Sequence, residues 1–143
     1  MRLRLTSFSH VIDSYAWIEY FRASPAGERA KKLIEGEGSA TPSIVVAEVS
    51  RKLLKEVEAG KETLEERGRH LEFIRASSQI LHLTFDLAAS AGEIDVEMKK
   101  KARGWGLVDS IVLTFARSAD ARIVTGNEHF REIKEAMMIK EKP

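Results

Sequence analysis

The sequence predicts an α/β fold in which a central parallel sheet of about five strands is flanked by helices on both faces. Short apolar segments of strand length alternate with longer segments of helical periodicity along the 143 residues. Strands separated by helices favour parallel pairing, because parallel neighbours need a long crossover connection. No linker, repeat or low-complexity tract interrupts this pattern, so residues 1–143 are expected to form a single domain.

Turn and cap residues mark the elements of the first half of the chain. Ser24-Pro25 is typical of a helix start, and Gly36 and Gly60 are typical of helix ends. In chain order we expect a strand at 8–13, helices at 14–21 and 25–34, a strand at 39–41, and helices at 44–58 and 63–76.

The second half repeats the alternation. Thr84 is a good N-cap for a helix with apolar residues at helical spacing, and Gly104 and Gly106 break the pattern around Trp105. The expected elements are a strand at 79–83, a helix that Thr84 caps and Gly104 breaks, a buried helix at 107–117, a strand at 121–125, a short helix at 128–134 and a strand at 137–139.

Composition excludes several kinds of protein. The chain has no cysteine, which excludes disulfides, iron–sulfur clusters and thiol nucleophiles. No apolar run approaches the roughly 20 residues needed to span a bilayer, and the first residues lack the apolar core of a signal peptide, so we expect a cytoplasmic protein with no membrane contact. The net charge is only +1, so binding to nucleic acid would need local basic patches.

Asp13 stands where the first apolar segment ends, in the run Val11-Ile12-Asp13-Ser14. The carboxyl ends of parallel strands are where α/β sheets bind ligands, so this position favours a functional carboxylate. Asp13 or Ser14 could equally serve as the N-cap of the helix that follows.

Glu48 and Asp109 are acidic residues inside apolar helical segments, SIVVAEV and LVDSIVL. A carboxylate on a buried face is costly unless it is paired or bound to a cation. Two structural alternatives remain open: Glu48 could pair with Arg51 or Lys52, and Asp109 could complement the dipole at the start of its helix.

Three carboxylates gathered at one sheet edge would repel one another, by roughly 3 kcal/mol for two charges about 5 Å apart at an effective dielectric of about 20. Such a cluster is tolerable if it binds divalent cations or shares protons. Oxygen ligands without histidine or cysteine favour Mg²⁺ or Mn²⁺. The chemistry that fits is metal-assisted hydrolysis of a phosphodiester.

Four stretches in this order, VIDSYAWIEYF, TPSIVVAEVSRKL, LVDSIVLTFA and IVTGNEHF, resemble the PIN-domain ribonucleases, and most closely the VapC-type toxins of toxin–antitoxin pairs. The resemblance covers roughly residues 9–139. It implies a PIN-like fold in which Asp13, Glu48 and Asp109 hold Mg²⁺ or Mn²⁺. It also implies that single-stranded RNA is cleaved to leave a 5′-phosphate and a 3′-hydroxyl.

The same resemblance implies that Ser14, Ser110 and Thr125 supply hydroxyls that support the acids or metal-bound waters. It implies a homodimer that is silenced by a cognate antitoxin protein.

The last stretch departs from the family pattern Thr-x-Asp-x-x-Phe, because Asn127 stands at the aspartate position. Asn127 stays in the expected catalytic set, with one negative charge fewer, so a second metal should bind more weakly. Glu128 could substitute from the adjacent position, although neighbouring side chains point elsewhere. Of the four histidines, only His129 is near this edge, and none has paired metal-ligand spacing.

Lys100, Lys101 and Arg103 precede the loop that leads to Asp109, and they could bind RNA phosphates or simply complement a solvated helix end. Trp105 in that loop could stack on a base or pack internally. Two alternative functions remain open. One is a PIN-like protein that binds RNA or a partner with weak or no nuclease activity. The other is an RNA-processing nuclease unrelated to toxin–antitoxin function.

Overall fold

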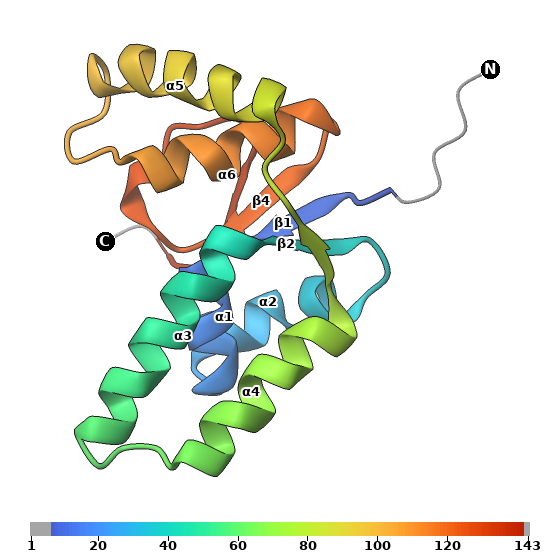
Figure 1. The fold of residues 1–143 in the computed structure, drawn as a ribbon, viewed down its shortest axis with the longest axis vertical. Coiled ribbons are helices and arrows are strands. Elements are labelled where there is room, and N and C mark those ends of the chain that lie inside the picture. Colours follow the sequence, from blue (N-terminus) through green and yellow to red (C-terminus); the bar gives the residue numbers. More distant parts are fainter. Residues whose placement is uncertain (1–6, 142–143) are drawn as a thin grey trace.

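The computed structural model describes residues 7–141, and its centre is a five-stranded, all-parallel sheet with strand order β3-β2-β1-β4-β5 (Figure 1). The elements in chain order are β1 (His10–Ile12), α1 (Ser14–Phe21), α2 (Pro25–Glu35), β2 (Ser39–Pro42), α3 (Ser43–Glu58), α4 (Leu64–Ser77), β3 (Gln79–Leu81), α5 (Phe85–Lys99), α6 (Leu107–Ser118), β4 (Arg122–Thr125), a 3₁₀ turn (Glu128–Phe130) and β5 (Ala136–Met138).

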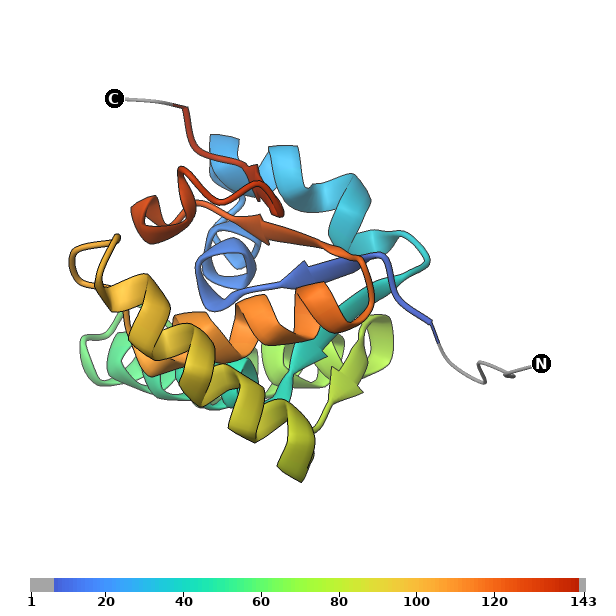
Figure 2. The same ribbon diagram turned by 90° about the horizontal axis from the view of Figure 1, so that it is seen from above.

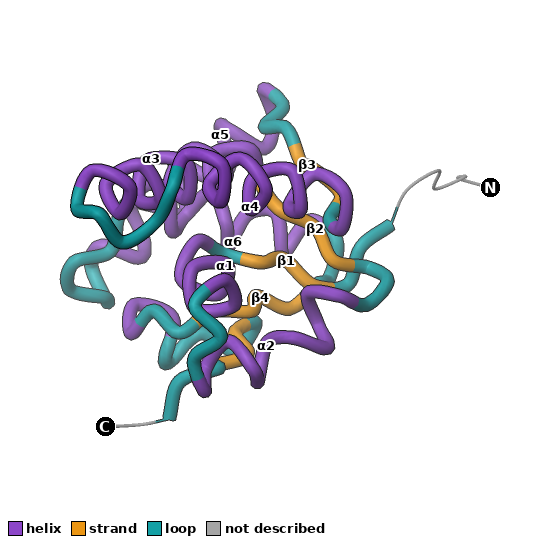
Figure 3. Tube along the Cα trace, turned by 90° about the horizontal axis from the view of Figure 1, so that it is seen from below, coloured by secondary structure: helices purple, strands orange, loops and turns teal. Residues whose placement is uncertain are grey.

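Strand β1 lies at the centre of the sheet and pairs with β2 on one side and β4 on the other. The chain builds outward from β1 to β3, then returns to the other side of β1 to add β4 and β5. Figure 3 shows β3, β2, β1 and β4 in this order across the molecule. The strand order therefore reverses beside β1, which is where open α/β sheets place their ligand sites.

Helices cover both faces of the sheet. Helix α6 packs against β1 and β4, with α5 packed outside it. Helix α2 lies over the opposite face (Figure 2). Helices α3 and α4 pack together as an antiparallel pair that extends away from the sheet (Figure 1).

The core is apolar because the central strands are covered on both sides. Val11, Ile12, Ile123 and Val124 are fully buried in the two neighbouring strands β1 and β4. Trp17 is also fully buried, and its indole nitrogen donates to the Thr41 hydroxyl at 3.0 Å, which ties α1 to β2.

Side-chain caps start several helices at the predicted places. Ser24 and Thr84 accept hydrogen bonds from backbone N–H groups in the first turns of α2 and α5. Thr63 forms a reciprocal capping box with Glu66 at the start of α4.

The predicted fold class is confirmed, and the differences lie near the chain's end and at strand ends. The short helix expected at 128–134 is only a 3₁₀ turn over Glu128–Phe130, after which the chain runs in turns to β5. The strand expected at 79–83 stops at Leu81, because Leu83 and Thr84 already belong to the exposed approach to α5. Within residues 7–141, no helix has both the length and the apolar character needed to cross a membrane.

Candidate functional site

Three carboxylates from distant parts of the chain lie near one another at the carboxyl edge of the sheet. Asp13 follows β1, Glu48 lies in the second turn of α3 just after β2, and Asp109 lies in the first turn of α6. Each of the three pairs interacts by mutual Coulombic repulsion: Asp13 with Glu48, Asp13 with Asp109, and Glu48 with Asp109. The structure therefore brings the three predicted acids together.

Asp13 is buried and is also the N-cap of α1. Its Oδ1 accepts from the Ala16 backbone N–H at 3.0 Å, and its Oδ2 accepts from the Thr125 hydroxyl. Burial raises the pKa of Asp13 to about 7, and repulsion from Glu48 and Asp109 acts in the same direction, while the two hydrogen bonds offset part of the rise. Capping and a site role are therefore compatible in this residue.

Glu48 is partly buried beside Ser14. Burial raises the pKa of Glu48, a hydrogen bond from Ser14 lowers it, and repulsion from Asp109 raises it again. Among residues 7–141, Glu48 forms no salt bridge with Arg51 or Lys52. The described structure therefore contains no close ion pair at Glu48, although the charge of Arg51 lowers the Glu48 pKa.

Asp109 is held by two donors on one of its oxygens. Its Oδ2 accepts from the Gly106 backbone N–H at 2.9 Å, which caps α6. His129 Nδ1 lies 2.9 Å from the same oxygen and donates to it in the tautomer that carries its proton on Nδ1. The other oxygen, Oδ1, has no protein donor within the described part of the chain.

Hydrogen bonds connect the loop after β4 to the site. Thr125 donates to Asp13 and accepts from the Asn127 backbone N–H at 3.0 Å. The side-chain oxygen of Asn127 accepts from the His129 backbone N–H at 2.9 Å. Glu128 is exposed and pairs with Arg131, so it turns away from the position that it would need to replace Asn127.

A pocket of 360 Å³ opens beside these residues. It is lined by Ser14, Tyr15, Ile18, Glu48, Arg51, Lys52, Lys55 and Asn127. The pocket therefore combines three members of the predicted site, Ser14, Glu48 and Asn127, with three cations from α3.

The donor chemistry of this edge fits a hard divalent cation. Carboxylate, hydroxyl and amide oxygens are the ligands that Mg²⁺ and Mn²⁺ prefer. A buried carboxylate whose pKa is raised to about 7, as in Asp13, gains most from a cation that stabilises its charge. Within residues 7–141 no three acidic or histidine side chains form a ready-made chelate. The three acids are neighbours, and a shared ion would require their side chains to converge.

Ser110 differs from the role expected of it. Its hydroxyl accepts from the Trp105 indole N–H at 2.7 Å and donates to Asp95 at 3.0 Å. It therefore supports the loop before α6 and not the carboxylates of the site. Trp105 is only 3% exposed, which favours the packing interpretation of this residue over base stacking.

The pocket that contains Glu48 and Asn127 is lined by cations other than those expected. Lys100 pairs with Glu97 at the end of α5, and Lys101 and Arg103 line a separate pocket. Sequence reasoning missed the α3 cations, although a signal existed: Arg51, Lys52 and Lys55 follow Glu48 by three, four and seven residues, which places all four on one helix face.

Comparison with solved structures supports the fold. A toxin–antitoxin complex from Klebsiella pneumoniae has a chain with 20% identity and a TM-score of 0.68, and the match covers 94% of this chain and 100% of that one. A protein from Pyrobaculum aerophilum gives 18% identity and a TM-score of 0.72, with 94% and 92% covered. VapC20 from Mycobacterium tuberculosis, described as a sarcin–ricin loop cleaving toxin, gives 18% identity and a TM-score of 0.67. The match covers 88% of this chain and 95% of that one.

Among curated proteins, none matches this sequence. The family model described as the PIN domain matches residues 10–136, which is most of the chain and includes all three carboxylates. The predicted resemblance is thus confirmed at the level of the family. The strand order, the acids that gather beside β1 and this family match lead to one assignment: the chain belongs to the PIN domain family.

Proposed function

We propose that this protein is a Mg²⁺- or Mn²⁺-dependent ribonuclease that cleaves single-stranded RNA. The observation that carries the proposal is that Asp13, Glu48 and Asp109 are neighbours at the carboxyl edge of the sheet and repel one another, with Asp13 buried and its pKa raised to about 7. A buried acidic cluster of this kind disfavours folding unless a cation compensates for it. Its all-oxygen chemistry fits hydrolysis of phosphodiesters.

The residues of the chain divide the work. Asp13, Glu48 and Asp109 would hold the metal, and Asn127 would add a neutral oxygen at the rim of the pocket. Thr125 fixes Asp13 through its hydroxyl, and Ser14 supports Glu48. A bound divalent cation would supply activation of the attacking water and stabilisation of the negative charge on the leaving oxygen.

The biological role that we propose is that of a toxin in a toxin–antitoxin pair, acting in the cytoplasm as a homodimer. The structural relatives named above include a toxin–antitoxin complex and a toxin described as cleaving the sarcin–ricin loop, and their chains match this one over nearly their whole length. An antitoxin protein is the implied partner. The RNA-processing alternative differs in one respect, since a processing nuclease has no dedicated antitoxin.

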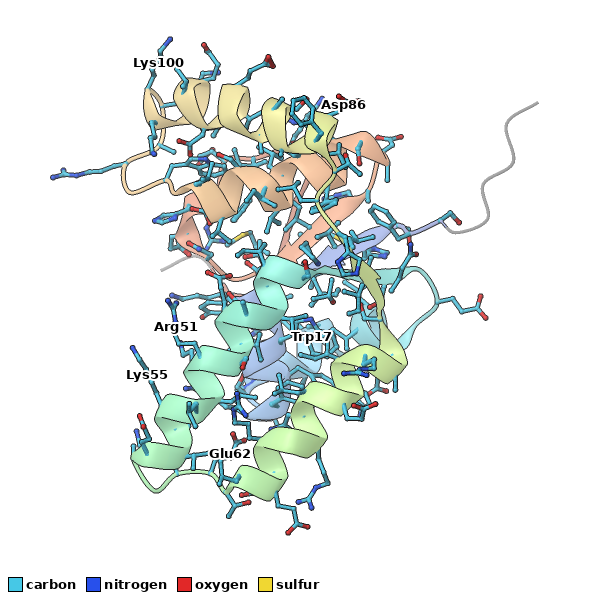
Figure 4. All side chains as sticks on the ribbon, in the orientation of Figure 1. Trp17, Arg51, Lys55, Glu62, Asp86 and Lys100 are labelled. Atoms are coloured by element: carbon cyan, nitrogen blue, oxygen red, sulfur yellow. The ribbon has the colours of Figure 1, made fainter. Side chains whose placement is uncertain are left out.

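Cleavage of unstructured RNA tests the enzymatic proposal. Wild type should cut with Mg²⁺ or Mn²⁺ and stop when the metal is chelated. Asp13→Asn and Glu48→Gln should each reduce the rate by at least 100-fold, because both remove a metal-binding charge. Asp86→Asn is the matched control, since Asp86 is an exposed acid at the start of α5, far from the pocket (Figure 4). Circular dichroism verifies that each variant is folded.

Two results would contradict the enzymatic proposal. One is cleavage by Asp13→Asn at the wild-type rate, and the other is a wild type that binds RNA but never cuts it, which would favour the non-catalytic alternative. Mapping of the product ends adds a further check, because hydrolysis assisted by metal should leave a 5′-phosphate. Expression in bacterial cells tests the toxin role: growth should stop, and the product of the adjacent gene should restore it.

A further inference from the structure

Helix α3 carries three exposed cations on the same face as Glu48. Arg51, Lys52 and Lys55 line the 360 Å³ pocket together with Glu48 and Asn127. Figure 4 shows Arg51 and Lys55 projecting from the same side of α3. We call these three residues the α3 basic surface.

Within the described residues, the α3 basic surface forms none of the salt bridges that neutralise many other cations of this protein, although Glu48 and Glu56 lie close enough to attract Arg51 and Lys52. Arg22, Lys99, Lys100, Arg117 and Arg131 each form a salt bridge with an aspartate or glutamate. None of the three α3 cations forms one within residues 7–141. Glu56, four residues after Lys52 on the same helix, forms its salt bridge with Arg22, just after α1, although the charge of Lys52 also lowers its pKa. An unpaired row of cations is expected to attract anions.

The α3 basic surface extends from Glu48 toward the C-terminal end of α3. At about 1.5 Å per residue, the step from Glu48 to Lys55 covers about 10 Å of helix, so the surface reaches beyond the single phosphate at the site. A second hollow of 210 Å³ continues it, lined by Lys52, Lys55 and Lys61 with Glu56 and Ala59. The cations therefore form a track and not one isolated anion site.

We propose that the α3 basic surface binds the phosphate backbone of single-stranded RNA and fixes the direction in which the strand enters the site. This inference rests on the proposed function and adds the path of the substrate. Phosphate contacts of this kind position a strand without reading its sequence. Target choice must then come from other parts of the pocket.

The alternative path, over the loop between α5 and α6, is less suited to RNA. Lys101 and Arg103 line a hollow whose cations, which include Arg117 and Lys134, are largely offset by three glutamates: Glu128, Glu132 and Glu135. Lys100, just after the end of α5, is already paired with Glu97. These residues offer a matched control, since both sets contain two lysines and one arginine.

The test measures RNA binding without cleavage. A short fluorescent single-stranded RNA is titrated with Asp13→Asn protein by anisotropy over a range of salt concentrations. Adding Arg51→Gln, Lys52→Gln and Lys55→Gln should lower the slope of log affinity against log salt by about 2, because each lost contact to single-stranded RNA contributes about 0.7. Near 0.1 M salt the affinity should fall by roughly 10- to 100-fold. Lys55→Gln alone should lower the slope by about 0.7.

The control triple, Lys100→Gln with Lys101→Gln and Arg103→Gln, should leave the slope nearly unchanged. If both triples weaken binding equally, or if the α3 triple leaves the slope as it was, the inference is wrong. Failure of the proposed function is a separate result: it is read from wild-type cleavage, whereas this experiment reads only binding. A folded α3 triple, verified by circular dichroism, is required for the comparison.

Discussion

At the scale of single residues, the surroundings of Asp13 have opposite effects on the ionisation of its carboxyl group. As an N-cap it accepts a hydrogen bond from Ala16, which favours the carboxylate. As a buried neighbour of Glu48 and Asp109 it is pushed toward the protonated acid, and its pKa rises to about 7. The metal-free protein should therefore carry a measurable penalty at neutral pH.

That penalty predicts a pH-dependent effect of Asp13→Asn. In the unfolded chain the aspartate ionises near pH 3.8, whereas the folded protein holds the proton to about pH 7. The stability that protonation of Asp13 contributes is thus complete below about pH 3.8 and is lost as pH rises to about 7. A pKa difference of about three units corresponds to about 4 kcal/mol in the free energy of unfolding. Asparagine does not titrate, so the stability of Asp13→Asn relative to wild type should increase by up to this amount between about pH 4 and pH 8.

Urea denaturation in the presence of a chelator, at several pH values, measures this difference. A difference that stays constant across the range would show that Asp13 is ionised normally in the folded protein.

His129 gives a second prediction at this scale, because it holds one oxygen of Asp109 and its backbone N–H holds Asn127. Gly104 allows the close approach, since a Cβ there would lie 3.0 Å from His129 Nε2. His129→Leu should weaken Mn²⁺ binding by roughly 10-fold through loss of one hydrogen bond to a charged group. His129→Asn retains a hydrogen-bond donor near the position of Nδ1, so it should keep most of the wild-type Mn²⁺ affinity.

Calorimetric titration with Mn²⁺ measures both His129 variants, with thermal unfolding as the check on structure. Equal weakening by leucine and asparagine would mean that His129 only fills space.

Glu48 and Asp109 could be singled out from the sequence because each interrupts an apolar run, which is costly without a purpose, and Asp13 because it stands where the first strand ends. The contacts of Ser110 and His129 could not. Both residues stand at helix starts or turns where several acceptors lie within reach, and only the packed structure selects Asp95 for one and Asp109 for the other.

At the scale of elements, the position of α1, which follows Asp13, depends on its close crossing with α2. A Cβ added to Gly27 would lie 2.1 Å from the backbone oxygen of Glu19 in α1. Backbone cannot yield as a flexible side chain can. The crossing therefore requires glycine at this position.

Gly27→Ala should destabilise the protein by about 2 to 3 kcal/mol, because the added methyl group forces the two helices apart. Gly92→Ala is the matched control in the exposed part of α5, where a Cβ meets nothing within 4 Å, and it should stabilise by about 0.5 to 1 kcal/mol through helix propensity. Denaturant unfolding compares the two. A neutral Gly27→Ala would mean that the α1–α2 crossing adjusts freely.

Helix boundaries were predictable where capping residues and glycines mark them, as at Ser24, Thr63 and Thr84. The helix expected at 128–134 fails for a physical reason. Asn127 caps only a single turn, and the backbone N–H of Ile133 bonds to Phe130 in another turn that leads directly into β5. Local propensity there is overridden by pairing of the last strand with β4.

At the scale of the whole molecule, metal binding and folding should be coupled. The three acids lie on segments that are far apart in sequence and join only in the folded chain. A cation that binds only the folded state adds about 2.7 kcal/mol when its concentration is 100 times its dissociation constant. Mn²⁺ should therefore raise the melting temperature of wild type, and the increase should vanish in Glu48→Gln.

Differential scanning calorimetry with and without Mn²⁺ measures this coupling, with Asp86→Asn as the charge-matched control. A melting temperature that rises equally in Glu48→Gln and wild type would place the ion elsewhere.

The strand order around β1 has one more consequence. The exposed segment at Leu83 and Thr84 divides the chain into a piece that holds β1, β2 and β3 and a piece that holds β4 and β5. Asp13 and Glu48 belong to the first piece, and Asp109 and Asn127 belong to the second. Neither fragment contains all of the proposed metal ligands. If the proposed function holds, a protein split at this segment should therefore be inactive until its halves reassociate through pairing of β1 with β4.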